Sequence, residues 1–352
     1  MNNKTIVVAL SGGVDSSTAA LLLKEQGYNV VGLTLKLFNK TNTSENSQDI
    51  KDAEAIAKKL DIDFHLLDYQ KKFDETIVNY FCSEYLNGKT PNPCVYCNEQ
   101  IKFKILIEFA DEHNIDFIAT GHYAKIEYSY EFNRFILKKS VDLKKDQSYF
   151  LYRLTQDYLK RIILPLGNYT KEQIRSIAKQ NNLITSEKKD SQEICFITKN
   201  SYAKFIESKT AKKPKSGLII NSDTGKILGK HKGLINYTIG QRKGLGIAYS
   251  EPLYVNKIDV ENNILYVGTW HNVLKNKLIA KDIKINIPEK LNDSAHCLAK
   301  IRHSHKAALA TLTKFAEDKI EMVFNEPQSA ITPGQSVVFY ENDIVIGGGI
   351  IE

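Results

Sequence analysis

Short apolar runs alternate with amphipathic stretches along the first half of the chain. Apolar runs rich in β-branched residues indicate buried strands, and apolar positions three or four residues apart indicate helices. The predicted strands are residues 5–10, 30–38, 63–67 and 116–120. The predicted helices are residues 18–26, 50–60, 73–86 and 101–113, and the polar residues 39–48 predict a mobile loop. This alternation predicts an α/β domain with a doubly wound parallel sheet, whose ligands bind at the carboxyl ends of the strands.

After about residue 200 the helical pattern gives way to short strand-like runs separated by turns. These runs are residues 217–221, 253–258, 264–267, 278–287, 297–301, 308–312, 319–324, 336–340 and 344–351. Polar residues at 261–263 and 342–343 indicate hairpin turns, and the basic residues 209–215 are typical of a linker. We therefore expect an α/β domain, a small mainly-β central domain and a C-terminal β-barrel, at residues 1–205, 206–272 and 273–352.

The sequence Ser-Gly-Gly-Val-Asp-Ser-Ser, residues 11–17, separates the first predicted strand from the first predicted helix. Its two glycines allow the backbone to approach a ligand closely, and the unpaired N–H groups of the first helical turn favour an anion. We expect Ser16 or Ser17 to cap that helix. Asp15 would repel a phosphate, so we expect a Mg²⁺ ion to bridge the two. The Walker pattern is absent, and the alternative is a tight strand-to-helix turn that binds nothing.

The overall composition is that of an ordinary globular protein. With 352 residues the chain is long enough for two or three domains, and 42% of its residues are hydrophobic and 25% charged. No apolar run is long enough to cross a bilayer and no targeting segment precedes the first predicted strand, so we expect a cytoplasmic protein. A net charge of +7 is compatible with a polyanionic partner. Five cysteines are too few for a disulfide framework here, which favours catalysis or metal binding.

The cysteines fall into two groups. Cys94 and Cys97 form a C-x-x-C pair in a proline-bracketed turn before the helix predicted from residue 101. A helix N-terminus lowers the pKa of a nearby thiol, so we expect a thiolate here, and lysines 188 and 189 could act likewise on Cys195 unless it is a buried strand residue. Zinc is disfavoured because no second pair of ligands accompanies the first. Two cysteines in apolar segments are predicted to be core residues: Cys82 and Cys297.

Five segments carry a family resemblance. They are residues 9–17 (ALSGGVDSS), 90–103 (TPNPCVYCNEQIKF), 145–152 (KDQSYFLY), 190–197 (DSQEICFI) and 231–246 (HKGLINYTIGQRKGLG). The first segment, taken by itself, resembles the PP-loop of the N-type ATP pyrophosphatases, which cleave ATP between its α and β phosphates. The five segments together resemble the tRNA-specific 2-thiouridylases, in which they occur in the same order.

The resemblance implies a reaction. Members of this family replace O2 of the wobble uridine, at position 34 of the tRNA, by sulfur. ATP converts the oxygen into an adenylate with release of pyrophosphate, and AMP leaves as sulfur enters. Cys97 matches the family's nucleophile and Cys195 matches its persulfide carrier, so a disulfide between them would remain after turnover. The implied partners are tRNAs for Lys, Glu and Gln and a sulfur-relay protein or cysteine desulfurase, and the implied state is a monomer.

The resemblance also implies binding residues, and it makes Asp15 a residue needed for adenylation. The residues that match the family's ATP contacts are Ala9, Leu10, Ser11, Gly12, Gly13, Val14, Asp15, Ser16, Leu35 and Gly121. Those that match the segment beside the target base are Asn92, Pro93 and Cys94. Those that match a tRNA-contacting loop are Lys145, Asp146, Gln147 and Ser148. The base has to leave its stack before its O2 can be reached.

The sequence departs from the family pattern at two places. Many members carry Asp at the position of Cys94, so Cys94, Cys97 and Cys195 could instead be ligands of an iron–sulfur cluster. In the last domain, Arg302 and His303 stand where many members carry an Arg-Tyr-Arg string that contacts tRNA. Histidine is a weaker, pH-dependent phosphate ligand, so the tRNA contacts of this domain stay open.

Three other functions stay open at this point. Another PP-loop synthetase that acts on a small molecule would explain residues 11–17 but not the cysteines. A non-catalytic RNA-binding protein with a structural nucleotide would bind tRNA without releasing pyrophosphate. A 4-thiouridine synthetase usually has an RNA-binding domain before its PP-loop, whereas the loop begins at residue 11 here.

Overall fold

The computed structural model describes residues 4–38, 47–188, 194–197, 202–210, 213–291, 294–316 and 318–352. The chain forms two compact units. The first unit consists of Met1–Ile77, Cys94–Phe196 and Asp343–Val345, and the second consists of Val78–Pro93, Ile197–Asn342 and Ile346–Glu352. The loop predicted at residues 39–48 lies outside the described residues except at its end, where Gln48 begins a helix.

A parallel five-stranded sheet forms the centre of the first unit. Its order is β3-β2-β1-β4-β7, and all neighbouring strands are parallel. The strands are β1 (Thr5–Ala9), β2 (Asn29–Lys36), β3 (Asp63–Asp68), β4 (Phe117–Ala119) and β7 (Ile162–Ile163). Ile6, Val7 and Val8 of the middle strand are completely buried, which explains the apolar run in the sequence. The predicted α/β fold class is confirmed.

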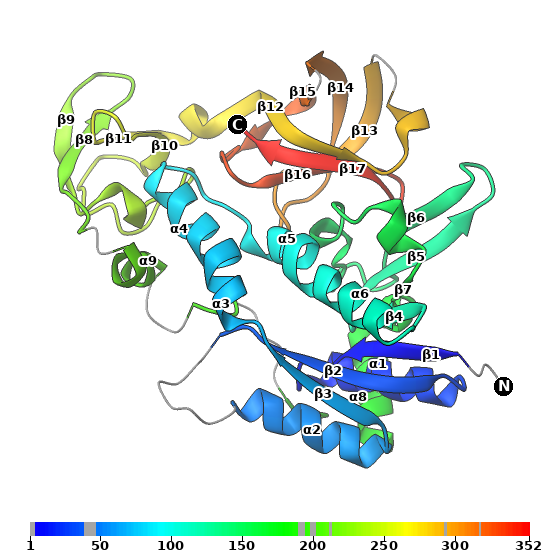
Figure 1. Cartoon of the computed structure of the whole chain (residues 1–352). Helices are drawn as coiled ribbons and strands as arrows, with labels where there is room; N and C mark the ends of the chain where they lie inside the picture. The colour runs from blue at the N-terminus through cyan, green and yellow to red at the C-terminus, as the bar shows by residue number, and fades with distance from the viewer. Residues whose placement is uncertain are drawn as a thin grey trace. The chain divides into compact units, whose positions relative to one another are not determined.

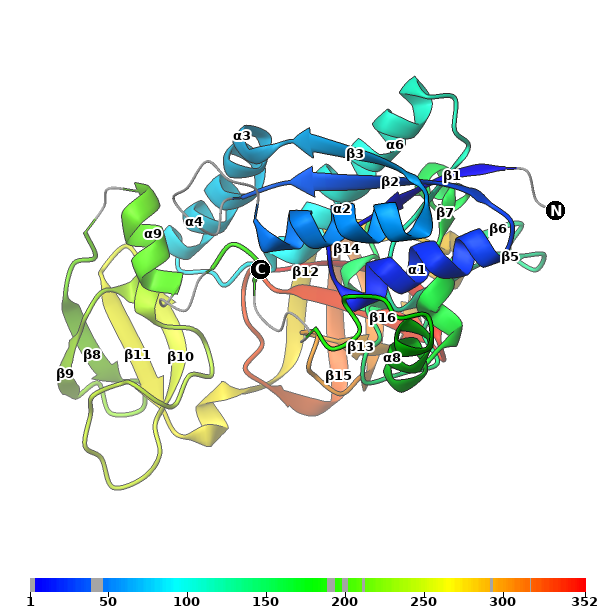
Figure 2. The ribbon, with the colours of Figure 1, turned by 90° about the horizontal axis from the view of Figure 1, so that it is seen from below.

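Helices lie on both faces of this sheet (Figures 1 and 2). One face is covered by α1 (Val14–Glu25), α2 (Gln48–Leu60) and α8 (Lys171–Gln180), and the other by α6 (Phe103–Glu112). The predicted apolar face of α2 is buried in the core with the residues of β1 and α1. As in other doubly wound sheets, the candidate ligand-binding segments follow the carboxyl ends of strands: the loop before α1 follows β1, and the turn with Gly121 follows β4.

Two helical stretches each contain a turn of π-helix. The first stretch consists of α3 (Gln70–Phe73), a π turn at Asp74–Val78 and α4 (Asn79–Leu86). The second consists of α5 (Pro93–Cys97), a π turn at Asn98–Lys102 and α6. The second stretch therefore begins at Pro93 and not at the predicted residue 101. Proline is well tolerated at the first helical position, because the N–H that it lacks has no partner there.

An antiparallel hairpin in the first unit was not predicted. It consists of β5 (Ala124–Ser129) and β6 (Arg134–Lys139). Charged residues interrupt its apolar pattern, and Asn133, with φ of 47°, forms the turn. The shorter helices of this unit are η3 (Ser148–Phe150), α7 (Gln156–Leu159) and η4 (Pro165–Asn168).

The second unit contains a four-stranded sheet of order β10-β11-β8-β9. Its strands are β8 (Gly217–Asn221), β9 (Ile227–His231), β10 (Tyr254–Asp259) and β11 (Ile264–Gly268). Only β9 was not predicted, since a glycine and a lysine interrupt its apolar run. In the same unit α9 (Tyr202–Thr210) lies against α4, with the rings of Tyr85 and Tyr202 4.9 Å apart.

Six strands close the predicted β-barrel. They are β12 (Leu274–Ile285), β13 (Ser294–Lys300), β14 (Ala308–Ala316), β15 (Lys319–Ser329), β16 (Ser336–Glu341) and β17 (Ile344–Ile351). β12 pairs with both β15 and β17, which closes the barrel around the buried side chains of Met322, Val337 and Phe339. The turn residues Asn263 and Asn342 have φ of 53° and 55°, in agreement with the predicted hairpins.

Three short 3-10 helices complete the second unit. They are η5 (Leu234–Asn236), η6 (Trp270–Val273) and η7 (Pro288–Lys290). Among the helices of the described residues, none has the length and apolar character needed to cross a membrane.

Candidate active site

The loop after β1 has the geometry of an anion site. Gly13 is the N-cap residue of α1, and no side chain accepts a hydrogen bond from the first turn at this cap. Ser16 and Ser17 lie inside the helix and donate to the Gly13 carbonyl oxygen at 3.2 and 2.9 Å. The prediction that one of them caps the helix is therefore wrong. The N–H groups of the first turn of α1 can therefore donate to an anionic ligand, which the positive end of the helix dipole also attracts.

Two glycines allow close packing around this loop. Gly12 has φ of +68°, and a Cβ atom there would lie 2.0 Å from the carbonyl oxygen of Asp49. Gly121 follows β4, and a Cβ atom there would lie 2.8 Å from the backbone nitrogen of Ser16. The structure thus brings together predicted ATP-binding residues from β1, α1 and the turn after β4. Leu35 is half-buried near the end of the adjacent strand β2.

Asp15 is bound by a lysine that the sequence analysis did not identify. Its carboxylate accepts hydrogen bonds from the Lys171 ammonium at 2.7 and 2.8 Å and from the Tyr123 hydroxyl at 2.8 Å. The side chain of Lys171 is only 10% exposed, so its charge needs this partner. Because both carboxylate oxygens already bind a cation, Asp15 in this arrangement does not fit the predicted role of a Mg²⁺ ligand.

Cys94 and Cys97 lie inside a helix and not in a turn before one. Three-residue spacing on α5 places both thiols on the same side, directly after the half-buried Asn92 and the buried Pro93. Burial raises the pKa of the Cys97 thiol to about 12 and also raises the pKa of Cys94. The predicted lowering of the thiol pKa is therefore wrong for this arrangement, because the loss of hydration outweighs the favourable charges nearby.

Lys102 is a second cation that the sequence analysis overlooked. It ends the π turn, and the five-residue bonding of this turn brings it to the side of the helix that carries Cys97. Burial lowers the pKa of Lys102, but Cys97, Cys195 and Cys94 outweigh this effect and raise it overall. Lys102 in turn lowers the pKa of Cys97, second only to the opposing effect of burial. It is therefore placed to stabilise a thiolate when one forms.

His122 contributes no charge to this region. Its ring is stacked on that of Phe103 at 5.7 Å, and its Nδ1 lies 2.7 Å from the Thr120 hydroxyl oxygen. Burial, and then the charge of Lys102, lowers the pKa of His122 to about 3. The imidazole is therefore neutral at physiological pH.

Cys195 is the exposed member of the cysteine set. It lies close enough to Cys94 and Cys97 to raise the pKa of both thiols. Only residues 194–197 of its matching segment are described, and Phe196 there packs edge-on against Phe73 at 5.5 Å. Cys82 and Cys297 are buried, as predicted for core residues.

Lys188 binds two carboxylates, and its predicted effect on the Cys195 thiol stays a prediction. Its ammonium binds Asp49 at 2.8 Å and Asp52 at 2.6 Å and donates to the Gly12 carbonyl oxygen at 2.7 Å. Its charge is therefore matched by two carboxylates of α2, and it ties the chain before Cys195 to the phosphate loop. Lys189 lies outside the described residues.

The loop predicted to contact tRNA is held largely by internal bonds. Asp146 and Ser148 are buried, and the Ser148 hydroxyl donates to the Asp146 carboxylate at 2.8 Å. The side-chain oxygen of Gln147 accepts from the Tyr123 backbone N–H at 2.9 Å. Asp146 and Ser148 thus shape the loop, and contact with tRNA stays a prediction for all four residues of the loop, of which Lys145 and Gln147 are half-buried.

Arg302 and His303 lie just after β13 in the second unit. The Arg302 guanidinium donates to the carbonyl oxygens of Ser329 and Ala330 at 3.5 and 3.3 Å, and His303 is half-buried. Burial, and then Arg302, lowers the pKa of nearby His305, which keeps that ring neutral. Their contact with tRNA stays a prediction.

Cys94, Cys97 and Cys195, as described, do not form a site for a single metal ion. Across the described residues, no three His, Cys, Asp or Glu side chains are placed to hold one ion. Cys94, Cys97 and Cys195 are all described and lie near one another. The ligands of a cluster bind different irons and lie further apart than those of one ion, so the iron–sulfur cluster stays a prediction.

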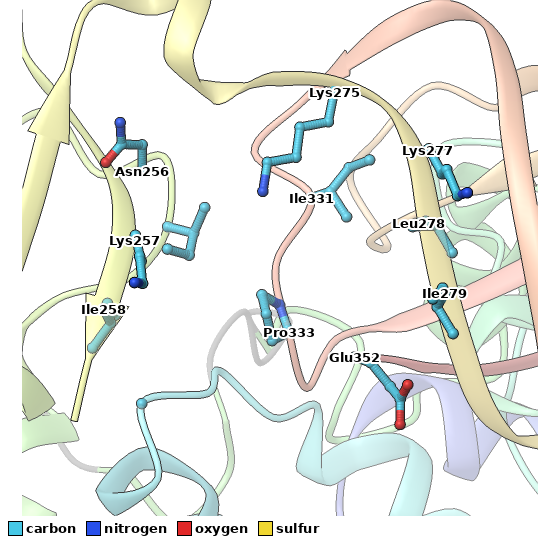
Figure 3. Close-up of a pocket in the computed structure, with 12 residues that line it drawn as sticks. Asn256, Lys257, Ile258, Lys275, Lys277, Leu278, Ile279, Ile331, Pro333 and Glu352 are labelled. Atoms are coloured by element: carbon cyan, nitrogen blue, oxygen red, sulfur yellow. The ribbon is translucent and has the colours of Figure 1, made fainter. Parts of the chain in front are cut away.

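A pocket of about 410 Å³ lies in the second unit. Lys257 of β10 and Lys275 and Lys277 of β12 contribute to its lining, and Figure 3 shows Lys275 extending into the space between these strands. Every lining residue belongs to the second unit, whereas the phosphate loop and the cysteines Cys94, Cys97 and Cys195 belong to the first. The lysines of this pocket could bind an anion, but no cysteine is among its lining residues.

Three family models match consecutive parts of the chain. Residues 4–199 match a tRNA methyl transferase HUP domain, residues 203–269 match a tRNA methyl transferase PRC-barrel domain, and residues 275–351 match an aminomethyltransferase beta-barrel domain.

Curated relatives match over the whole chain. The chain is 47% identical over 360 residues to the tRNA-specific 2-thiouridylase MnmA of Acetivibrio thermocellus, with 100% of both chains covered. It is 46% identical over 356 residues to that of Clostridioides difficile, with 99% of this chain and 98% of the relative covered. A solved 4-thiouridine synthetase–RNA complex with bound ATP is similar only at a TM-score of 0.36, with 17% identity over 59% of this chain and 50% of that one, which is too low to bear on the site. The chain belongs to the family of tRNA-specific 2-thiouridylases, as its sequence motifs predicted.

Proposed function

We propose that the protein uses ATP to activate O2 of the wobble uridine of tRNA and replaces this oxygen by sulfur. One observation carries the proposal: the first unit contains both a loop suited to an anion and a cysteine pair, half-buried Cys94 and buried Cys97, within electrostatic reach of Cys195. A synthetase for a small molecule needs the loop but has no use for the cysteines. The names of the relatives support tRNA as the substrate and 2-thiouridine as the product.

The parts of the chain divide this work in our proposal. ATP binds along the residues that match the family's contacts, from Ala9 to Ser16 with Leu35 and Gly121, in the catalytic domain at residues 1–205. The segment of Asn92, Pro93 and Cys94 lies beside the target base. The domains at residues 206–272 and 273–352 hold the tRNA, with Lys, Glu and Gln acceptors expected. We further propose a cytoplasmic monomer.

The first step is adenylation. O2 of the uridine attacks the α-phosphorus of ATP, the new O–P bond forms, and pyrophosphate leaves with the electrons of the bond that breaks. The free N–H groups at the start of α1 are placed to stabilise charge on the phosphates. No step is assigned to a metal ion at Asp15, because Lys171 already binds that carboxylate.

The second step transfers sulfur. A donor protein first supplies a persulfide on Cys195, whose terminal sulfur attacks C2 of the base, and AMP leaves with O2. The Cys97 thiolate then attacks Sγ of Cys195, which forms a Cys97–Cys195 disulfide and leaves the sulfur on C2. Lys102 favours the thiolate that this attack needs. An external dithiol returns two electrons to the disulfide before the next turnover.

The test compares serine variants of the cysteines. Cys97→Ser and Cys195→Ser are expected to abolish thiolation while ATP and tRNA still bind, because only the sulfur step loses a thiol. Cys297→Ser, a buried cysteine of the second unit, is the matched control and should keep thiolation. Full activity of either active-site variant would remove that cysteine from the mechanism.

Iron analysis of anaerobically purified protein tests the sulfur route. A colourless, iron-free protein that thiolates tRNA with ATP and a sulfur donor supports the persulfide route. About four irons per chain, with activity lost on their removal, would instead make Cys94, Cys97 and Cys195 cluster ligands and overturn it.

A further inference from the structure

We propose that Lys171 is a positioning residue of the ATP site, which neutralises Asp15 and takes the place that a divalent cation would otherwise have there. This inference rests on the proposed function, because it assumes that the loop after β1 binds the phosphates of ATP. It explains how a loop that binds phosphates can contain the negatively charged side chain of Asp15.

The contact between the two side chains is a close ion pair. The Lys171 ammonium lies 2.7 Å from Oδ1 and 2.8 Å from Oδ2 of Asp15, so it faces both oxygens at once. The Tyr123 hydroxyl donates to Oδ1 at 2.8 Å, and the ammonium lies 5.8 Å from the centre of the Tyr123 ring. Mg²⁺ needs oxygen ligands at about 2.0–2.1 Å in octahedral geometry, and an ammonium across both oxygens excludes it from that side.

The position of Lys171 is fixed by its helix. It is the first residue of α8 and its backbone N–H donates to the Asp142 carboxylate at 3.0 Å. Thr170 caps the helix, and Gln173 completes a capping box. Lys171 is only 8% exposed, so the side chain cannot turn away into solvent without moving the helix. The charge is therefore placed in advance of ligand binding.

The electrostatic consequence concerns the phosphates. Asp15 belongs to the first turn of α1, where the helix dipole attracts an anion. An unpaired carboxylate there would cancel this attraction, and Lys171 removes the conflict by making the pair neutral. Lys171 thus favours ATP binding by neutralising the Asp15 carboxylate and not by contacting ATP itself.

A double-mutant cycle tests this arrangement in the full-length protein. The variants are Lys171→Met, Asp15→Asn and the double variant, with Lys179→Met at the exposed far end of α8 as the matched control. The dissociation constant of α,β-methylene-ATP is measured by calorimetry, with Mg²⁺ and with EDTA. The affinity for tRNA and the melting temperature are measured in parallel.

We expect Lys171→Met to weaken nucleotide binding about tenfold or more, because Asp15 then repels the phosphates, while tRNA affinity stays within about twofold. The double variant carries neither charge and should return to within about fivefold of the wild type. The effect of Asp15→Asn should be the same with Mg²⁺ and with EDTA. If Lys171→Met does not fold, the nucleotide affinity of the neutral double variant tests the inference, with the same fivefold limit relative to the wild type.

Three results would overturn the inference. Nucleotide affinity of Lys171→Met equal to that of the wild type would show that the pair has no influence on the site. A double variant beyond the fivefold limit would mean that Lys171 acts on the phosphates directly. A loss in Asp15→Asn that needs Mg²⁺ would make Asp15 a metal ligand. If the wild type itself bound no nucleotide, the proposed function would fail instead.

Discussion

His122 directly follows Gly121, the glycine that packs on the phosphate loop. Its imidazole is neutral, although the Asp15 carboxylate, which would favour a charged ring, lies in the same unit. Its charge state follows from burial and from Lys102, which both oppose a second cation. His122 is thus a neutral packing partner of Phe103.

This charge state makes stability depend on pH. The folded pKa of about 3 lies below the value of about 6.5 in the unfolded chain, so the unfolded chain binds more protons between these values. The free energy of unfolding should therefore fall as the pH falls below about 6.5. Between pH 7 and 5, the wild type should lose about 2 kcal/mol more than His122→Gln in urea denaturation.

The matched control for this comparison is His296→Gln, an exposed histidine of β13. Equal pH dependence in the wild type and His122→Gln would contradict the neutral state of the imidazole in the folded protein.

At the scale of elements, the π turn at Asn98–Lys102 is held from outside its own helix. Glu99 of this turn binds Arg153 at 2.6 Å, and the two side chains are only 15% and 6% exposed. The amide of Asn98 donates to the Phe150 carbonyl oxygen at 3.1 Å. These contacts fix the turn that places Lys102 beside the thiols.

Arg153→Met should destabilise the protein, because the Glu99 carboxylate then stays buried without its cation. The expected loss in the free energy of unfolding is about 3 kcal/mol. Lys71→Met removes one partner of an exposed pair with Glu75, with side chains 91% and 57% exposed, and should cost less than about 0.5 kcal/mol. Similar losses in both variants, measured by urea denaturation, would show that burial does not decide the strength of the pair at Glu99.

Elements with a strong local pattern could be predicted from the sequence. The run β1–loop–α1 has an apolar strand, two glycines and a helix in direct succession, and the barrel strands alternate with clear turns. The hairpin β5–β6 could not be found, because its charged residues hide the strand period. The early start of α5 was also missed, because the prolines before it are equally common in turns.

The site was only partly predictable for a related reason. Local motifs identified the phosphate loop and the cysteines, but the contact between Asp15 and Lys171 joins residues 156 positions apart. Nothing around Lys171 in the sequence distinguishes it from other lysines at helix starts. Likewise the raised thiol pKa values come from burial, which a short motif does not report.

At the scale of the whole molecule, the family match extends over the chain. We predict that lysines of the pocket in the second unit bind RNA phosphates. Lys275 extends into this pocket, whereas the ammonium of Lys277 is held by Glu321 at 2.6 Å. The two lysines on one strand therefore differ in the charge that they can offer to a phosphate.

Lys275→Ala should weaken tRNA binding and make it less sensitive to salt. Loss of one phosphate contact lowers the slope of log K against log salt concentration by about 1. Lys277→Ala is the matched control, and we expect a smaller change because Glu321 already neutralises that lysine. Filter binding at several salt concentrations measures both slopes, and equal slopes for Lys275→Ala and the wild type would exclude the contact.

The burial of Cys97 has a consequence for the enzyme between turnovers. Peroxide and other cellular oxidants react with thiolates, and a thiol with a pKa of about 12 offers almost none at neutral pH. Cys97 is also only 5% exposed, so oxidants reach it poorly. Between turnovers Cys97 thus stays a protonated thiol that reacts slowly with oxidants. The exposed cysteine is Cys195, which a donor protein has to reach.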